Sequence, residues 1–205
     1  MSNFPFFQNL PQIIGPYIIG WRDVRGDGNC GFRVLSHYMF GHEDGWVQAR
    51  NFLANELSTN PLLYHGPYLE GVTQAISRIR WESGPCGRSH WMQFPEDMFA
   101  IATMLNAVVV SIGNGTGVGR DFLNQCYTVL PLRSPANTTR PEREIIFGHL
   151  GTAFNHYIRL DMTPAFPLPP LAVLWRHWRT DSVRGWDNIY RDRLSAWLDL
   201  TGGQL

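Results

Sequence analysis

Apolar residues recur at helical spacing through the first half of the chain. Residues 32–39 and 45–57 each place an apolar side chain at every third or fourth position, which predicts one amphipathic helix apiece. A similar stripe over residues 69–79 predicts a third helix. A fourth is expected to start at Pro95, a favourable first-turn residue that two acidic residues follow. The first half is therefore predicted to be mainly helical.

The second half carries shorter runs that are typical of strands. Four of them cover residues 107–112, 127–130, 144–150 and 155–160. Because helices come first and strands later, the pattern predicts an α+β domain with a small central β-sheet flanked by helices.

The two ends of the chain differ from this central region. Residues 1–20 are apolar and interrupted by prolines, which predicts an extended N-terminal arm packed on the remainder. Residues 161–205 contain a proline-rich hinge and two Trp-rich segments, which we expect to form a C-terminal extension packed on the domain. Residues 21–160 would then form the main domain.

Composition excludes several classes of function. The net charge is zero and the pI is near 7, so the chain lacks the basic field that a nucleic-acid partner requires. All 17 basic residues are arginine. Without lysine there is no Schiff-base chemistry and no Walker-type phosphate loop, so the glycine-rich run 113–119 is expected to be a loop beside the site.

Neither a membrane nor a cofactor is indicated. No apolar run is long enough to span a bilayer. A signal peptide would need a basic residue near its start, but no basic residue precedes Arg22. The three cysteines, Cys30, Cys86 and Cys126, are too far apart for a zinc ribbon and odd in number, which disfavours a disulfide framework. We therefore expect a reducing compartment, cytoplasm or nucleus, and no metal or cofactor.

The strongest candidate for chemistry is Cys30, which stands where a glycine-containing turn passes into a helix. The positive end of a helix favours the thiolate, and free backbone amides there can hold an oxyanion. A structural buried cysteine is the commoner alternative. Among seven histidines, His156 is the preferred base because it stands on a stiff predicted strand late in the chain.

Three segments together resemble the ovarian-tumour (OTU) family of cysteine proteases, most of which are deubiquitinases. Residues 27–33 (DGNCGFR) resemble the nucleophile motif, residues 90–102 the Trp-containing segment with its helix, and residues 155–157 (NHY) the histidine strand. The likeness extends from about Trp21 to Trp197. It is greatest for OTU-like domains encoded in plant and fungal transposable elements, in which a Pro-Pro stretch and a Trp-bearing tail also follow the histidine.

The resemblance implies a papain-like OTU fold and a thiol-dependent isopeptidase that removes ubiquitin or a ubiquitin-like modifier. Cys30 would attack the carbonyl of the modifier's terminal glycine, and His156 would transfer the protons. The backbone amides of Asp27, Gly28, Asn29 and Cys30 would form the oxyanion hole. The missing lysines would then protect the enzyme from ubiquitination, although compositional drift explains them equally well.

The resemblance also implies substrate contacts. Trp91 would wall a slot that admits only a Gly-Gly terminus. Glu96 and Asp97 are candidate partners for the arginines in the tail of ubiquitin, although acids also suit a helix N-terminus. Asn155, beside the histidine, is a further candidate for binding substrate.

The residue that orients the histidine departs from the family pattern. Many members have Asp or Asn two residues after the histidine, whereas this chain has Ile158. Asp27 is the candidate third member, because some members use the Asp of this motif. Ile158 also leaves open a catalytically impaired, ubiquitin-binding module, and a fainter alternative is a papain-like hydrolase of small amides.

Overall fold

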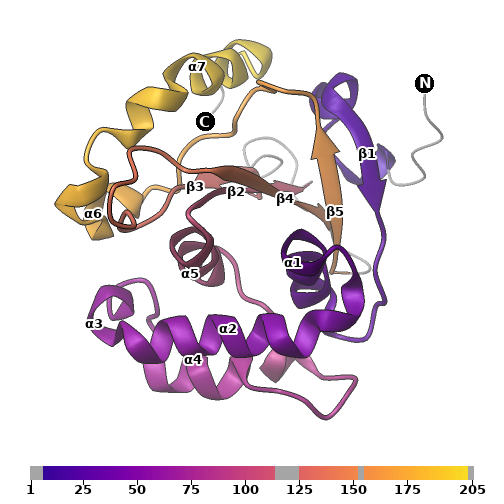
Figure 1. Ribbon diagram of the computed structural model, residues 1–205. Coiled ribbons are helices and arrows are strands. Elements are labelled where there is room, and N and C mark those ends of the chain that lie inside the picture. Colours follow the sequence, from indigo (N-terminus) through magenta and orange to yellow (C-terminus); the bar gives the residue numbers. More distant parts are fainter. Residues whose placement is uncertain (1–6, 114–124, 152–154, 203–205) are drawn as a thin grey trace.

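The structure of the chain is a computed structural model that describes residues 7–113, 125–151 and 155–202. It confirms the α+β prediction, with one five-stranded sheet flanked by helices (Figure 1). The strands are β1 (Ile18–Arg22), β2 (Ala107–Gly113), β3 (Tyr127–Val129), β4 (Arg143–Leu150) and β5 (His156–Met162). The α-helices are α1 (Cys30–Phe40), α2 (Trp46–Thr59), α3 (Pro61–Tyr64), α4 (Val72–Ile79), α5 (Glu96–Leu105), α6 (Trp175–Trp178) and α7 (Arg191–Leu200).

The order of strands in the sheet is β1-β5-β4-β2-β3. Strands β2 and β4 are parallel, and the other neighbouring pairs are antiparallel. The β1–β5 pairing sets Trp21 opposite Leu160 and Arg22 opposite Arg159. The sheet thus brings the segment just ahead of α1 beside the strand that begins at His156.

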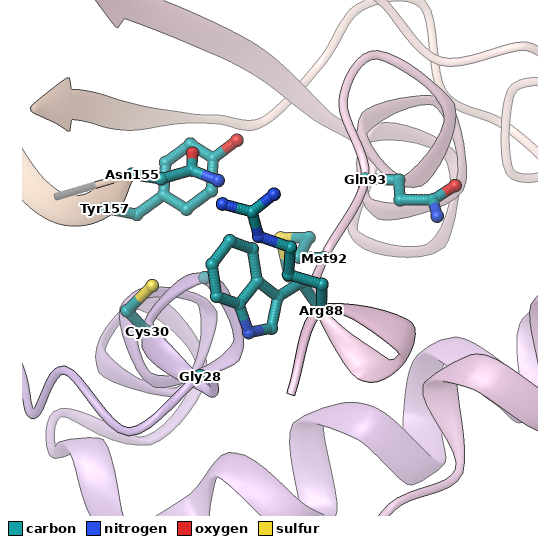
Figure 2. Close-up of a pocket in the computed structure, with 9 residues that line it drawn as sticks. Gly28, Cys30, Arg88, Met92, Gln93, Asn155 and Tyr157 are labelled. Atoms are coloured by element: carbon teal, nitrogen blue, oxygen red, sulfur yellow. The ribbon is translucent and has the colours of Figure 1, made fainter. Parts of the chain in front are cut away.

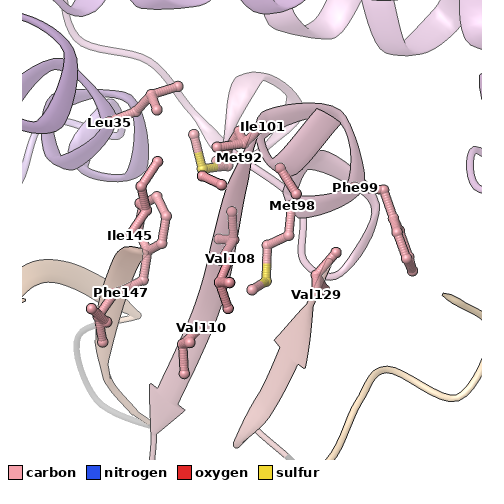
Figure 3. Packing of buried hydrophobic residues seen from close by; sticks show 14 of the residues in the cluster. Leu35, Met92, Met98, Phe99, Ile101, Val108, Val110, Val129, Ile145 and Phe147 are labelled. Carbon is pink, nitrogen blue, oxygen red and sulfur yellow. The ribbon is translucent and has the colours of Figure 1, made fainter. Parts of the chain in front are cut away.

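The helices cover the sheet in two layers. Helix α1 packs on β4 and β5, helix α5 packs on β2 and β3, and α2 lies beneath both of them with α4 alongside (Figure 1). Apolar side chains from α1, α5 and the sheet, among them Leu35, Ile101 and Val108, fill the space between the layers (Figure 3). Every residue of β2 is buried, as expected of a strand covered on both faces.

One predicted helix is shorter than its apolar stripe. The stripe began at residue 69, but Leu69 is 91% exposed and the helix starts at Val72. Gly71 has a φ of 92°, a left-handed conformation that interrupts the helix and suits glycine. Within the described residues, no helix is both long and apolar enough to cross a membrane.

Both ends of the chain pack on the central domain. The expected arm contributes part of β1, which continues across residue 20, and buries Leu10 and Ile14. In the C-terminal extension the indole of Trp175 is fully buried and donates a hydrogen bond to the carbonyl of Pro131 at 3.0 Å. Helix α7 lies on the far side of the sheet from α2 and α4 (Figure 1).

Candidate active site

A seven-residue loop, 23–29, joins β1 to α1 and delivers Cys30 as the first residue of the helix. Gly28 in this loop has a φ of 84°, and a Cβ there would lie 2.0 Å from the carbonyl oxygen of Cys86. Two independent constraints therefore require glycine at this position. The Cys30 side chain is 8% exposed and borders a pocket, so the thiol is covered by protein yet open to a ligand on one side.

The first residue of β5 completes a pair with this thiol. The imidazole of His156 lies beside Cys30, and its Nε2 donates to Oδ1 of Asp23 at 2.8 Å. Since Asp23 engages Nε2, Nδ1 is the ring nitrogen that faces the sulfur. The structure thus brings residues 30 and 156 close to each other.

Electrostatics favour a protonated imidazole in this pair. Burial on its own lowers the pKa of His156, but the hydrogen bonds and charges of Cys30 and Asp23 outweigh it and raise the pKa to about 9. Asp23 is itself held by the loop, because its Oδ1 accepts the Val24 amide at 2.8 Å. An oriented imidazolium beside a thiol is the arrangement of a thiol-dependent nucleophilic site.

Asp27, the predicted third member, has a different role. Its carboxylate accepts hydrogen bonds from Nε and Nη2 of Arg33, the latter at 2.6 Å, and also from the Asn29 amide. Burial would raise the pKa of Asp27, but these bonds hold it below its ordinary value. The structure therefore corrects the assignment: Asp27 braces the loop on helix α1, and Asp23 contacts the histidine.

The structure also leaves fewer donors for the predicted oxyanion hole. The Asn29 amide donates to Oδ1 of Asp27 at 3.0 Å, so it is not available to a substrate. Within the described part of the chain no acceptor contacts the amides of Asp27, Gly28 and Cys30. Of these three residues, Gly28 and Cys30 line the pocket.

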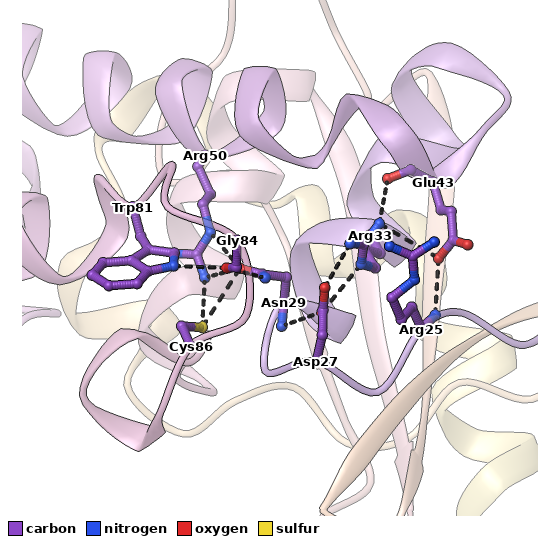
Figure 4. A network of polar contacts seen from close by, with 9 residues as sticks. All are labelled: Arg25, Asp27, Asn29, Arg33, Glu43, Arg50, Trp81, Gly84 and Cys86. Carbon is purple, nitrogen blue, oxygen red and sulfur yellow. Dashed lines mark hydrogen bonds and ion pairs between the residues drawn. The ribbon is translucent and has the colours of Figure 1, made fainter.

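A fully buried arginine connects the loop of residues 23–29, called the nucleophile loop below, to the neighbouring loop of residues 83–87 (Figure 4). The guanidinium of Arg50 donates twice to Oδ1 of Asn29, at 3.1 and 2.7 Å, and also to the carbonyls of Ile79 and His90. The side-chain Nδ2 of Asn29 in turn donates to the Gly84 carbonyl. Because Arg50 and Asn29 are both fully buried and paired, the network holds the loop rigidly below the thiol.

The pocket beside Cys30 has a volume of about 200 Å³ (Figure 2). Trp91 and Asn155, two of the predicted substrate contacts, line it. The lining residues come from the nucleophile loop, α1, the segment ahead of α5 and the start of β5: Gly28, Cys30, Gly31, Arg88, Trp91, Met92, Gln93, Asn155 and Tyr157. Asn155 adopts a positive φ of 39° and accepts a hydrogen bond from His149.

The two acidic candidates lie elsewhere. Asp97 is completely buried, where it pairs with Arg78 at 2.9 Å, accepts a bond from Tyr68 and caps the Gln93 amide. The structure corrects its assignment from substrate contact to anchor of helix α5. Glu96 is half-buried on α5, its pKa is raised by burial, and it does not line the pocket.

Sequence reasoning missed two residues at the site. Asp23 was overlooked because its partner is 133 positions away, although the β-rich residues just ahead of it are a strand signal. Arg88 was overlooked because an isolated arginine in a polar loop carries no local signal. The glycine-rich run expected beside the site lies beyond Gly113, outside the described residues. No group of three or more metal-ligating side chains occurs in the described residues.

No protein-family model and no curated protein matches the sequence. Among solved structures, the OTU domain of OTUD1 superposes with a TM-score of 0.51 at 14% identity, covering 78% of this chain and 99% of that one. The chain has an OTU fold. Viral OTU domain proteases from Dera Ghazi Khan virus and Qalyub virus superpose with TM-scores of 0.49 and 0.47, at 13% and 15% identity. Each superposition covers 73% of this chain, and the two cover 84% and 87% of the viral chains, respectively. This OTU fold carries Cys30 and His156 in contact.

Proposed function

We propose that this protein is a thiol-dependent isopeptidase, a deubiquitinase that removes ubiquitin or a ubiquitin-like modifier through a thioester intermediate. The observation that carries the proposal is the sequence of neighbouring side chains Cys30, His156 and Asp23, with Cys30 lining a pocket. The OTU fold and the motif around Cys30 support the choice of modifier. The three side chains supply nucleophile, proton carrier and orienting group.

In the first half-reaction Cys30 gives its thiol proton to His156, and the sulfur attacks the carbonyl carbon of the modifier's terminal glycine. The amides of Gly28 and Cys30 donate to the oxygen that becomes negative, which stabilises the tetrahedral intermediate. His156 then gives a proton to the departing amine as the C–N bond breaks. The carboxylate of Asp23 keeps the ring turned so that Nδ1 faces the reacting atoms.

In the second half-reaction water cleaves the thioester. His156, now neutral, accepts a proton from this water as its oxygen attacks the acyl carbon, and the thiolate of Cys30 leaves. The modifier departs with a free carboxylate, and the Cys30–His156 pair again holds the proton with which it began. Each step uses side chains of this chain alone.

The narrowness of the pocket favours an acyl group without side chains. Its volume of about 200 Å³ is below the roughly 300–1,000 Å³ of sites that bind drug-sized ligands. A Cβ on Gly31 would lie 2.8 Å from Cβ and Sδ of Met92, so the walls approach closely. With Trp91 alongside, the pocket suits two consecutive glycines and excludes larger residues.

Ile158 had suggested a catalytically impaired binding module. Its side chain is fully buried in the sheet, and Asp23 supplies an acceptor to the imidazole in its place. This contact supports the active enzyme over the impaired module. The proposed likeness to transposon-encoded OTU domains stays a prediction.

Covalent capture tests the proposed function. The protein is incubated with ubiquitin and ubiquitin-like probes that end in an electrophile after Gly-Gly, and adducts are measured by intact mass. We expect one adduct on Cys30, abolished in Cys30→Ala and strongly slowed in His156→Ala. Cys126→Ser is the matched control, because this buried thiol donates to the Gly113 carbonyl and serine preserves that bond.

Two results would contradict the proposal. Reversible binding of a probe with no adduct would identify a binding module instead. Labelling by small thiol reagents, with no capture by any modifier probe, would identify a hydrolase of small amides.

A further inference from the structure

The pocket carries a positive charge, whereas the predicted substrate contacts Glu96 and Asp97 would have made it negative. Its nine lining residues include no Asp or Glu, and the charged side chain among them is Arg88. The guanidinium of Arg88 is drawn across the pocket from Cys30, between Asn155 and Met92 (Figure 2). The pocket is therefore electropositive on the wall that faces the nucleophile.

Arg88 is held in place without being neutralised. Its Cζ lies 5.6 Å from the centre of the Trp91 ring, a stacking arrangement that leaves the N–H donors free. Trp91 is itself anchored, since its Nε1 donates to the carbonyl of Cys86 at 3.4 Å. Across the described ranges, no carboxylate forms an ion pair with this exposed arginine.

Three carboxylates near the site have other partners, and a fourth, Glu96, does not line the pocket. Asp27 pairs with Arg33, Asp97 with Arg78, and Asp23 with His156. Each of these bonds would have to break before its carboxylate could compensate Arg88. The positive charge is therefore directed at whatever enters the pocket.

We propose that Arg88 is a specificity-determining residue that selects a modifier with an acidic side chain close ahead of its terminal Gly-Gly. This inference rests on the proposed function and refines its substrate class. A guanidinium on a flat aromatic ring presents two parallel donors, which match the two oxygens of a carboxylate. An arginine of the substrate in the same place meets a like charge and is disfavoured.

The consequence concerns ubiquitin itself. Its tail carries arginines, so a tail in which an acidic or neutral residue stands in their place is the better substrate for this pocket. The modifier is thus defined by a chemical property, a carboxylate within the last four residues before the scissile bond.

Fluorogenic peptides test this directly. Peptides end in Gly-Gly joined to an amine reporter, and the third and fourth residues from the scissile bond are varied one at a time among Arg, Gln and Glu. We expect kcat/KM to rise in that order at one of the two positions, with Glu at least about fivefold better than Arg. The preference should shrink as added salt shortens the Debye length.

Charge reversal supplies the internal check. Arg88→Glu is expected to invert the order, so that the Arg peptide becomes the best substrate. Arg191→Glu is the matched control, because it makes the same charge change at an exposed position on α7, where the side chain contacts Asn188. It should leave the order unchanged.

The outcomes separate the two proposals. Cys30-dependent cleavage of all peptides with equal kcat/KM, or an order that Arg88→Glu does not alter, would overturn the role of Arg88 and leave the isopeptidase intact. Failure to cleave any peptide, together with no adduct on Cys30 from any modifier probe, would overturn both.

Discussion

Two aspartates, four residues apart in one loop, carry out different tasks. Asp27 is nearly covered, with 9% of its side chain exposed, and is paired to an arginine that is 3% exposed. Asp23 has 47% of its side chain exposed and is paired to a histidine beside the thiol. The same residue type therefore braces the loop at one position and orients an imidazole at the other.

The difference is set by the partner and its surroundings. Arg33 is permanently charged and buried on α1, so Asp27 compensates a cation that has little water. His156 titrates, and Asp23 shifts its balance toward the charged form while remaining open to solvent. The sequence motif alone would assign Asp27 as the residue that orients the histidine, because it stands inside the nucleophile motif.

The largest effect is expected from breaking the buried pair. Asp27→Ala leaves the Arg33 guanidinium without its main counterion and the Asn29 amide without its acceptor. We expect a loss of about 3 kcal/mol in the free energy of unfolding. Urea denaturation measures it.

Replacing both partners separates loss of the charge pair from loss of the fold. The double variant Asp27→Leu with Arg33→Met removes both charges together, so it should recover part of the stability that Asp27→Ala loses. A loss below about 0.5 kcal/mol in Asp27→Ala would show that this ion pair does not brace the loop.

The second effect is on activity. Asp23→Ala leaves His156 without its orienting acceptor, and we expect kcat/KM for a Gly-Gly substrate to fall about tenfold. This is well below the roughly 10⁴-fold loss in a serine triad, because a thiol ionises far more readily than a hydroxyl. Its unfolding free energy should change by less than about 0.5 kcal/mol, since Asp23 is half exposed. A large stability loss with unchanged kcat/KM would reverse the roles assigned to the two aspartates.

The smallest effect is a displacement of the pH profile. The pKa of His156 is raised to about 9, so the imidazolium needed by the leaving amine persists at neutral pH and is lost as the pH rises through that value. Asp23→Asn removes one of the groups that raise this pKa, and the alkaline limb of kcat/KM should move down by about one pH unit. Asp27→Asn serves as the comparison, and its limb should stay in place. Equal displacement in both variants would contradict the assignment.

Elements with strong local signals could be predicted from sequence. Helix α1 ends at Phe40, just ahead of Gly41 with its φ of 83°, and the strands β2 to β5 lie within a few residues of their apolar runs. The start of α4 was misplaced because Leu69 continues the stripe in sequence while its side chain faces solvent. Periodicity alone cannot distinguish an exposed leucine from a buried one.

Contacts between distant segments could not be predicted from local sequence. Glu96 and Asp97 stand side by side at a helix start, yet only Asp97 is buried, because Arg78 of α4 and Tyr68 meet it there. No property of residues 96 and 97 by themselves separates the two. Arg88 stacks on Trp91, only three residues away, but it faces Cys30 only because the chain folds both into the lining of one pocket.

The amino-acid sequence by itself determined the helix that begins at Cys30 and indicated this cysteine as the candidate nucleophile, because a glycine-containing turn that passes into an amphipathic run is encoded within a few neighbouring residues. It also indicated His156, through a local motif. Only the tertiary structure decided that Asp23 orients the imidazole, since that contact depends on β1 pairing with β5 across 133 positions. Hydrogen bonds between strands are made by every backbone alike, so the register that brings two side chains together emerges from the packing of the whole sheet.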